Sequence, residues 1–198
     1  MEITDLHRDP IAEFEKWFAL AKKTDLPHPN SMALATASKD GKPSVRVVLL
    51  KEVDESGFVF YTNFESRKGD DLEKNPFAAL GFHWDVLRRQ IRIEGSVERV
   101  SDLTSETYFQ SRPRESCLAA WASEQSKEIP DRMVLEKRFD ELRKKFENQK
   151  IPLPPFWGGY RVIPEQIEFW IEAPNRMHDR FCYQKQNESI WSIKRLAP

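Results

Sequence analysis

The chain has 198 residues, in which 31 Lys and Arg oppose 32 Asp and Glu, so its formal net charge is −1. A chain this close to neutrality is not expected to bind nucleic acid through bulk charge, and its 12% aromatic content sets it apart from disordered proteins. It has no run of about 18 apolar residues and no apolar signal core at its start, so we expect a cytoplasmic protein without a membrane span. The two cysteines and four histidines lack the spacing of metal ligands, which predicts free thiols and no metal site.

The first hundred residues are typical of one helix followed by a meander of antiparallel strands. The dipeptide Asp9-Pro10 suits a helix start, and apolar residues at positions 14, 17, 18 and 21 give that helix one buried face. Links such as Asp40-Gly41 are turn signals and are too short for parallel crossovers. Strands are predicted over 31–37, 44–51, 58–62, 77–83 and 88–100, with a short helix over 66–74.

The second half of the chain changes from strands to helices and back. Residues 101–124 are predicted to form two short helices that break at Arg112-Pro113. A longer helix over 131–149 is predicted to bury a stripe of Leu135, Phe139, Leu142 and Phe146. With a helical segment at about 101–150 between early and late strands, we expect one mainly β domain over 1–198, in which both ends of the chain complete one antiparallel barrel or sheet. The late strands are expected over 159–163, 166–171, 181–184 and 190–196.

The strand over 44–51 carries two basic residues. Its alternation places Val45, Val47 and Leu49 on one face and Arg46 on the other. Lys51 lies five positions after Arg46, so the two cations face opposite ways unless a bulge or the strand end intervenes. They are either two solvated edge cations or two groups that reach one ligand.

A second basic cluster follows the strand over 58–62. Ser66 suits the first position of a helix, and Arg67 and Lys68 come directly after it. Free backbone N–H groups at a helix start beside two cations suit a phosphate group. The alternative is an ordinary capped helix on the surface.

A third cluster surrounds the predicted break between the two short helices. Tyr108, Arg112, Arg114 and Ser116 combine two guanidinium groups with two hydroxyls, a set that suits a phosphate monoester. A solvated loop is the alternative interpretation.

The fourth candidate is His178, which Asp179 follows directly. A neighbouring acid can tune a histidine near neutral pH, but adjacent side chains diverge on a strand, so no catalytic triad is predicted. The sequence has no GxSxG, GxGxxG or GxxxxGK[ST] motif. The residues alone therefore predict a protein that binds anionic small molecules through side chains and helix starts, and they leave its reaction open.

Eight strings that together span about residues 9–198 carry a resemblance. They are RVVLLK (46–51), YTNFESRKG (61–69), RRQIRIEG (88–95), YFQSRPRES (108–116), FWGGYRV (156–162), EFW (168–170), NRMHDR (175–180) and RLAP (195–198). In this order they resemble the pyridoxine/pyridoxamine 5′-phosphate oxidase family. The resemblance implies a mainly β, FMN-binding split barrel with peripheral helices, and a homodimer with FMN at the subunit interface. It also implies hydride transfer from C4′ of pyridoxine or pyridoxamine 5′-phosphate to flavin N5, giving pyridoxal 5′-phosphate and reducing O2 to H2O2.

The family pattern carries over to individual positions. Arg176 and His178 match the two catalytic residues at the substrate ring: Arg176 is expected to clamp the ring and polarise the C4′ substituent, and His178 to position the substrate or shuttle a proton. Gln125 and Ser126 match a pair that the other subunit gives to FMN. Substrate contacts are implied for Lys51, Tyr108, Arg112, Ser116, Arg176, Met177 and His178. FMN contacts are implied for Arg46, Val47, Val48, Leu49, Leu50, Lys51, Tyr61, Thr62, Arg67, Lys68, Gln90, Gln125, Ser126, Trp170 and Arg180.

The chain also departs from the family pattern. Ile171-Glu172 replaces Gln-Gly beside the tryptophan, and an anion close to the flavin would disfavour its reduced anionic form. Lys127 replaces a serine, Cys117-Leu118-Ala119 replaces Gln-Ile-Gly, and Met177 replaces leucine. The arm that can cover the substrate in the family has no match before Asp9, so lid closure is in doubt. Two rival hypotheses are a flavin oxidase of the phenazine-pathway type and a non-catalytic binder of FMN or pyridoxal phosphate.

Overall fold

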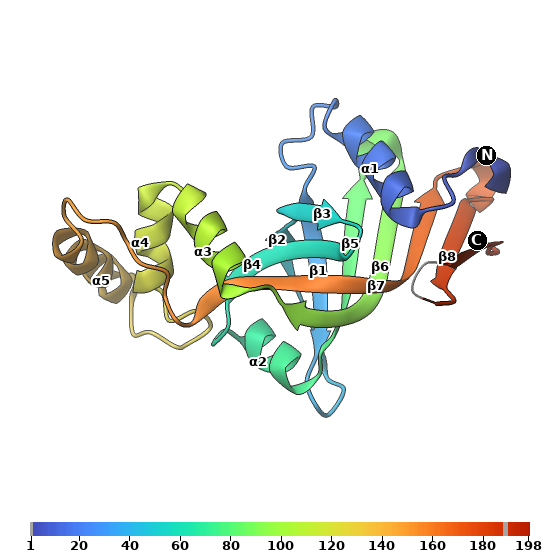
Figure 1. Cartoon of the computed structure of the whole chain (residues 1–198). Helices are drawn as coiled ribbons and strands as arrows, with labels where there is room; N and C mark the ends of the chain where they lie inside the picture. Colours follow the sequence, from blue (N-terminus) through green and yellow to red (C-terminus); the bar gives the residue numbers. More distant parts are fainter. Residues whose placement is uncertain (1, 188–189) are drawn as a thin grey trace.

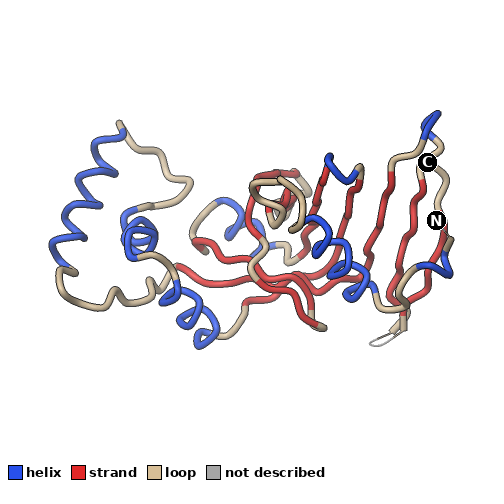
Figure 2. The backbone as a smooth tube through the Cα atoms, turned by 90° about the horizontal axis from the view of Figure 1, so that it is seen from above, coloured by secondary structure: helices blue, strands red, loops and turns tan. Residues whose placement is uncertain are grey.

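The computed structural model describes residues 2–187 and 190–198, and over these residues it has a nine-stranded antiparallel sheet and five α-helices (Figure 1). The strands follow the order β2-β1-β5-β6-β7-β4-β3, with β8 on β7 and β9 on β8. Seen from above, the sheet curls along the molecule, and helices α3, α4 and α5 gather beyond one end of it (Figure 2). The strands are β1 Ser31–Ala37, β2 Pro43–Leu49, β3 Glu52–Asp54, β4 Gly57–Asn63, β5 Phe77–Trp84, β6 Arg89–Arg99, β7 Trp157–Ile171, β8 Asp179–Lys185 and β9 Trp191–Arg195. The helices are α1 Pro10–Ala21, α2 Arg67–Lys74, α3 Asp102–Ser111, α4 Arg114–Ala122 and α5 Arg132–Lys145.

Helix α1 covers the main core, as its apolar spacing predicted. Asp9 caps it by accepting a hydrogen bond from the Ile11 amide at 3.0 Å, and Pro10 occupies the first turn. Phe14 and Trp17 are fully buried. The Phe14 ring meets Phe58 edge to face at 4.8 Å, so the helix is fastened to the sheet by aromatic packing.

The expectation of two separate late strands over 159–163 and 166–171 is wrong, because both belong to strand β7. It runs unbroken for 15 residues and pairs with β6 along its length, while β4 and then β8 pair with its other edge. Pro164 lies between the β4-paired and β8-paired halves, opposite Gly95 at an irregularity in the β6 register. A Cβ on Gly95 would lie 1.9 Å from the Ile163 carbonyl oxygen, so glycine is required there. The proline marks a change of partner rather than the end of a strand.

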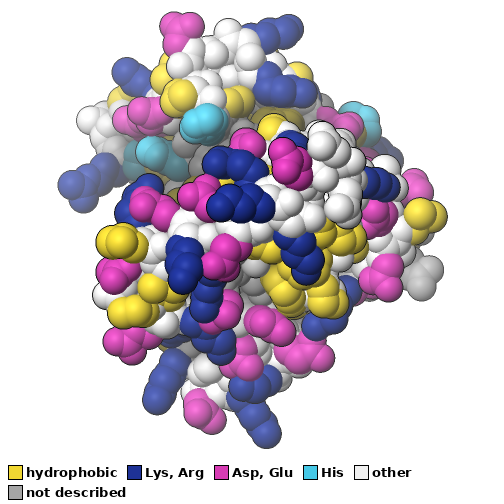
Figure 3. All heavy atoms as spheres, turned by 90° about the vertical axis from the view of Figure 1, so that its left-hand side faces the viewer, with side chains coloured by type: hydrophobic (Ala, Val, Ile, Leu, Met, Phe, Trp, Pro, Cys, Tyr) yellow, Lys and Arg dark blue, Asp and Glu magenta, His cyan; other side chains and the backbone are white. Residues whose placement is uncertain are grey.

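A second hydrophobic cluster lies under α3, α4 and α5 and includes Phe109, Leu118, Phe146 and Trp157. The predicted break at Arg112-Pro113 separates α3 from α4. The predicted stripe of α5 is buried only toward its end, where Phe146 is 7% exposed, whereas Leu135 is 36% exposed. Charged side chains of both signs cover much of this end of the molecule (Figure 3), and α5 carries ion pairs four residues apart such as Arg132–Glu136.

The exposed face of β2 is apolar. Val45 and Val47 are each 69% exposed and Leu49 is 39% exposed, while Arg46 and Val48 face the opposite side. The predicted alternation is therefore confirmed, and the face of β2 that carries Arg46 is the one that points inward. Exposed apolar stripes are typical of surfaces that bind a partner or a ligand. Within the described ranges, no helix is long and apolar enough to cross a membrane.

Candidate functional site

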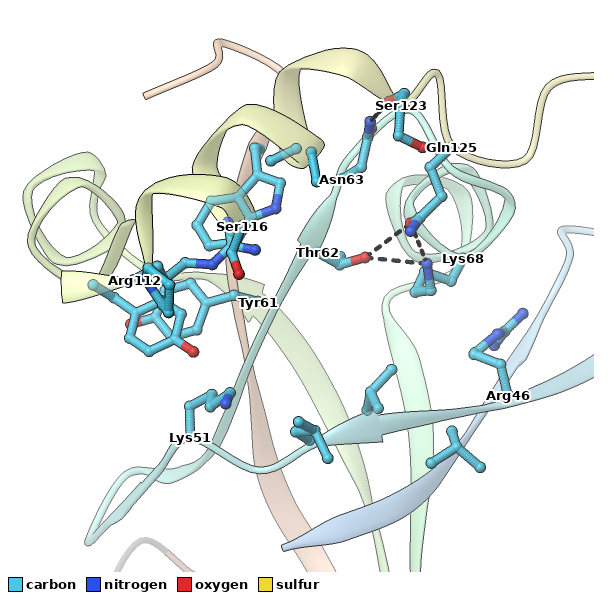
Figure 4. A pocket seen from close by; sticks show the side chains of 18 residues that line it. Arg46, Lys51, Tyr61, Thr62, Asn63, Lys68, Arg112, Ser116, Ser123 and Gln125 are labelled. Carbon is cyan, nitrogen blue, oxygen red and sulfur yellow. Dashed lines mark hydrogen bonds between the residues drawn. The ribbon is translucent and has the colours of Figure 1, made fainter. Parts of the chain in front are cut away.

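A cavity of about 800 Å³ lies between β2, β4, the start of α2, and the α3–α4 helices (Figure 4). Four cations line it: Arg46 and Lys68 toward one end, and Lys51 and Arg112 toward the other. None of its described lining residues is acidic. A partly enclosed space with four positive groups and no negative one favours a ligand that carries more than one anionic group.

The end of strand β2 brings Arg46 and Lys51 to the same cavity. Arg46 is fixed by hydrogen bonds to Thr36 Oγ1 at 2.7 Å and Ser44 Oγ at 2.8 Å. After Leu49 the chain leaves β2, and the Lys51 amide donates to the Val59 carbonyl at 2.9 Å. Lys51 therefore pairs with β4 instead of continuing β2 along β1. Its side chain can reach the same ligand as Arg46, although five positions on one regular strand would place the two side chains on opposite faces. The intervening Leu50 is buried in the core and does not line the cavity.

Lys68 is buried at the first turn of α2, where the predicted capping residue Ser66 accepts from the Gly69 amide. Its Nζ donates to Gln125 Oε1 at 2.7 Å, Ser66 Oγ at 3.0 Å and Thr62 Oγ1 at 3.1 Å. Loss of solvation, and then the nearby charge of Arg46, lower the pKa of Lys68 to about 8. Among the described residues Lys68 has no ion-pair partner, and an anion in the cavity would supply one.

Within one chain Gln125 contacts Lys68, and the expectation that Gln125 reaches the other subunit's cofactor stays a prediction. Gln125 follows α4 and returns to the cavity of its own chain, where it also contacts Thr62. Its neighbour Ser126 has a left-handed backbone, with φ of 71°, and lines an adjacent pocket together with Arg67 and Lys127. The spacing of the chain gave no signal of this return, because residues 123–131 form an irregular link.

The other end of the cavity holds Arg112 on an aromatic layer. Tyr61 and Tyr108 stack with ring centroids 3.9 Å apart, and the Arg112 guanidinium lies 4.7 Å from the Trp157 ring centroid. Burial raises the pKa of Tyr61 to about 12, so its phenol stays protonated at neutral pH. The buried Nη1 of Arg112 has no hydrogen-bond partner within the part of the chain that the structure describes. An unpaired buried donor in a cation-lined cavity suits an oxyanion.

The third predicted cluster is only partly brought together. Tyr108, Arg112 and Ser116 all line the cavity, but Arg114 turns away and donates to the backbone carbonyls of Gln149 and Phe146. Arg114 is therefore a structural residue that binds backbone carbonyl groups just after the C-terminal end of α5. Trp157, which supports Arg112, was not among the expected site residues. It lies in the FWGGYRV string that carried the resemblance, but no site role was expected for it.

A second group of expected site residues lies outside this cavity, on β6, β7, β8 and the loop before β8. Gln90, Trp170 and Arg180 are neighbours on three adjacent strands, because Gln90 pairs with Trp170 and Trp170 pairs with Arg180. His178 lies 4.6 Å from the Trp170 ring, and its Nδ1 accepts a hydrogen bond from the Ala173 amide at 3.1 Å. Arg176 is exposed in the same loop, with φ of 62°. We refer to Gln90, Trp170, Arg176, Met177, His178 and Arg180 as the second group.

The two sets of residues do not meet within one chain. Strand β8 lies at the opposite end of the molecule from α3 and α4 (Figure 1), and no member of the second group lines the cavity. A ligand that contacts both sets therefore needs a second copy of the chain.

Comparison with known proteins identifies the family. A family model described as pyridoxamine 5′-phosphate oxidase matches residues 21–146, and one described as the pyridoxine 5′-phosphate oxidase C-terminal dimerisation region matches 157–198. A protein of Psychromonas ingrahamii named pyridoxine/pyridoxamine 5′-phosphate oxidase is 56% identical over 96% of this chain and 87% of its own length. The chain belongs to the pyridoxine/pyridoxamine 5′-phosphate oxidase family. A relative with the same name from Acaryochloris marina is 52% identical over 98% of this chain and 89% of its own.

Solved structures agree with this family. PhzG from Burkholderia lata 383, solved in complex with tetrahydrophenazine-1-carboxylic acid, is 31% identical and superposes with a TM-score of 0.92 over 98% of this chain and 95% of its own. An FMN-binding protein of Nostoc punctiforme is 17% identical with a TM-score of 0.76 and shows the shared fold, over 98% of this chain and 100% of its own. The family and oxidase class that the eight strings indicated, and the antiparallel β fold, are thereby confirmed.

Of the departures from the family pattern, Ala119 lines the cavity, whereas the others lie outside its lining. Lys127 lines the adjacent pocket, and Cys117 is buried with its thiol 3.3 Å from the Phe109 carbonyl. Glu172 is exposed just after β7, and its amide donates to the Arg88 carbonyl. In its own chain Glu172 therefore does not add a negative charge to the cation-lined cavity.

Proposed function

We propose that the protein is an FMN-dependent oxidase that converts pyridoxine 5′-phosphate or pyridoxamine 5′-phosphate to pyridoxal 5′-phosphate, with O2 reduced to H2O2. The observation that carries this proposal is the cavity with two cations at each end and no acidic side chain among the described residues that line it. FMN and the substrate each carry one phosphate group, so two separate cationic ends match two ligands. Family membership supports the same reaction.

The residues of the cavity fit both phosphate groups. Among the residues that the structure describes, Lys68 is buried without an acidic partner and the buried Nη1 of Arg112 has no hydrogen-bond partner, so each end has a donor that an anion would satisfy. We assign Arg46, Lys68, Thr62 and Gln125 to the FMN phosphate. We assign Lys51, Tyr108, Arg112 and Ser116 to the substrate phosphate.

The protein is proposed to act as a homodimer in which the second group completes the partner's cavity. Three observations support this arrangement: the separation of the two sets of residues, the exposed apolar stripe of β2, and the dimerisation region matched by 157–198. Gln90, Trp170 and Arg180 are then assigned to the flavin, and Arg176 and His178 to the substrate ring.

Bound FMN would accept the hydride from substrate C4′ at N5 and pass the electrons to O2. The chain contributes orientation and proton placement. Because His178 Nδ1 accepts from the Ala173 amide, its proton resides on Nε2, and His178 is a hydrogen-bond donor to the substrate. This favours positioning of the substrate over abstraction of its proton. Arg176 supplies a fixed positive charge for the ring and the C4′ substituent.

Anaerobic addition of pyridoxine 5′-phosphate to FMN-loaded protein tests the proposal directly. We expect the flavin absorbance to bleach, and to return on admission of O2 with pyridoxal 5′-phosphate formed. Flavin that binds but is bleached by neither the alcohol nor the amine substrate would refute the oxidase and favour a non-catalytic binder.

The same assay separates a phenazine-type oxidase, which the likeness to PhzG makes the second candidate. The Lys51, Arg112 and Ser116 end of the cavity favours a phosphorylated substrate over a carboxylated ring system. Bleaching by a reduced phenazine carboxylate, with pyridoxine 5′-phosphate inert, would reverse this choice.

A further inference from the structure

Arg180 is bound on one side by a buried carboxylate. Its Nε donates to Glu168 Oε1 at 2.8 Å and its Nη2 to Glu168 Oε2 at 3.0 Å. This is the two-pronged geometry in which arginine binds carboxylate most strongly. The Glu168 side chain is 4% exposed and that of Arg180 is 25% exposed, so the pair is shielded from solvent on the Glu168 side. Hydrogen bonding to Glu168 raises the pKa of Arg180 and keeps its positive charge.

The C-terminal tail binds Arg180 from a different direction. Its Nη1 donates to the Ala197 carbonyl at 2.8 Å, and its own carbonyl accepts from the Leu196 amide at 2.9 Å. One residue earlier, Arg195 forms an ion pair with Asp179. The tail thus runs beside the first residues of β8, which follow the loop of Arg176 and His178.

These contacts leave the guanidinium with little freedom. Three of its N–H groups are used by Glu168 and Ala197, and one N–H on each terminal nitrogen has no acceptor among the described residues. Glu168 lies two residues before Trp170 on β7, and Arg180 pairs with Trp170, which in turn pairs with Gln90 on the next strand. A side chain with several rotatable bonds is therefore pre-set before any ligand arrives.

We propose that Glu168 and the tail residues Leu196 and Ala197 are positioning residues that hold Arg180 in the orientation required to bind FMN. We call this set of contacts the Arg180 clamp. The inference rests on the proposed function, because it takes Arg180 as a flavin contact. It gives a role to the terminal RLAP string and to the glutamate of EFW, which the cavity does not use.

Substitution at Glu168 tests one side of the clamp. Glu168→Gln keeps the shape of the side chain and removes the charge that fixes both nitrogens of Arg180. Loss of a hydrogen bond between charged groups is expected to raise the FMN Kd roughly tenfold, measured by quenching of flavin fluorescence on titration of the FMN-free protein. Glu94→Gln is the matched control, because Glu94 pairs with Arg92 on the same sheet but does not contact Arg180. It should bind FMN like wild type.

Deletion of the tail tests the other side without altering the sheet. Removal of residues 197–198 takes away the Ala197 carbonyl and should also raise the FMN Kd, whereas removal of Pro198 alone leaves an acceptor at Ala197 and should not. Sedimentation velocity on each variant checks that the assembly of wild type is kept.

A double-mutant cycle distinguishes positioning from a general loss of stability. In an Arg180→Ala background, Glu168→Gln should cause no further rise in the FMN Kd, since its effect acts through Arg180. Independent, multiplying effects on Kd would overturn the clamp, as would an unchanged Kd in both E168Q and the two-residue deletion. Wild-type protein that binds no FMN would overturn the proposed function and the clamp with it, so the two failures are distinguishable.

Discussion

Lys68 makes the stability of the FMN-free protein depend on pH in a defined direction. The side chain is 8% exposed, and desolvation with the charge of Arg46 lowers its pKa from 10.5 to about 8. A shift of this size corresponds to a cost of about 3 kcal/mol for keeping the buried lysine charged. Because the pKa is lower in the folded state, the cost is fully present below about pH 8 and disappears as pH rises toward 10.5.

Replacement of Lys68 by methionine removes this titration. The free energy of unfolding of wild type should therefore increase relative to Lys68→Met by about 2–3 kcal/mol between pH 7 and pH 10. Denaturant unfolding of the FMN-free proteins at several pH values measures the difference. Lys74→Met, at an exposed lysine on the same helix paired with Asp70, is the matched control and should follow wild type. A difference between wild type and Lys68→Met that stays constant over this range would refute the reasoning.

Four further predictions concern ligands and assembly. The FMN Kd should rise by up to about tenfold per pH unit above pH 8, since charged Lys68 is the form that binds phosphate; a Kd that is flat to pH 10 in fluorescence titrations would contradict this. Arg112→Met should raise the KM for pyridoxine 5′-phosphate at least about tenfold while leaving FMN affinity unchanged, because it removes the unpaired buried donor; steady-state kinetics with a parallel FMN titration measure both. Arg176→Ala should lower kcat strongly with FMN still bound, and a kcat equal to that of wild type would refute the catalytic assignment of Arg176. Val45→Glu should place a charge in the apolar stripe of β2, outside the cavity lining, and yield monomers that release FMN; monomers that retain flavin in sedimentation would refute a shared site.

Local patterns were sufficient for most elements of the fold. The Asp9 and Ser66 caps and the break at Arg112-Pro113 depend on residues close in sequence, so they could be predicted and are confirmed. The continuity of β7 could not be predicted, because a proline usually ends a strand. Pro164 is tolerated inside β7 because it lies where the neighbouring strand changes from β4 to β8.

The candidate site likewise has features that local sequence predicts and others that depend on contacts between distant residues. Residue types alone identified Arg46, Lys51, Lys68 and Arg112 as candidate phosphate ligands, and the structure brings all four to one cavity. The return of Gln125 to its own chain depends on an irregular link whose path has no periodicity. Contacts between residues far apart in sequence decide such details. The separation of the second group from the cavity likewise follows from the sheet order and not from any local string.

Strand β7 serves both sets of residues, since Trp157 near its start supports Arg112 in the cavity and Trp170 near its end belongs to the second group. In the proposed dimer, each copy of β7 therefore contributes to two different sites. A copy with a defective cavity still supplies a sound second group, and a copy with a defective second group still supplies a sound cavity. Mixing two such inactive variants should regenerate one working site in each mixed dimer, so that genetic complementation would report the shared architecture without any structure of the complex.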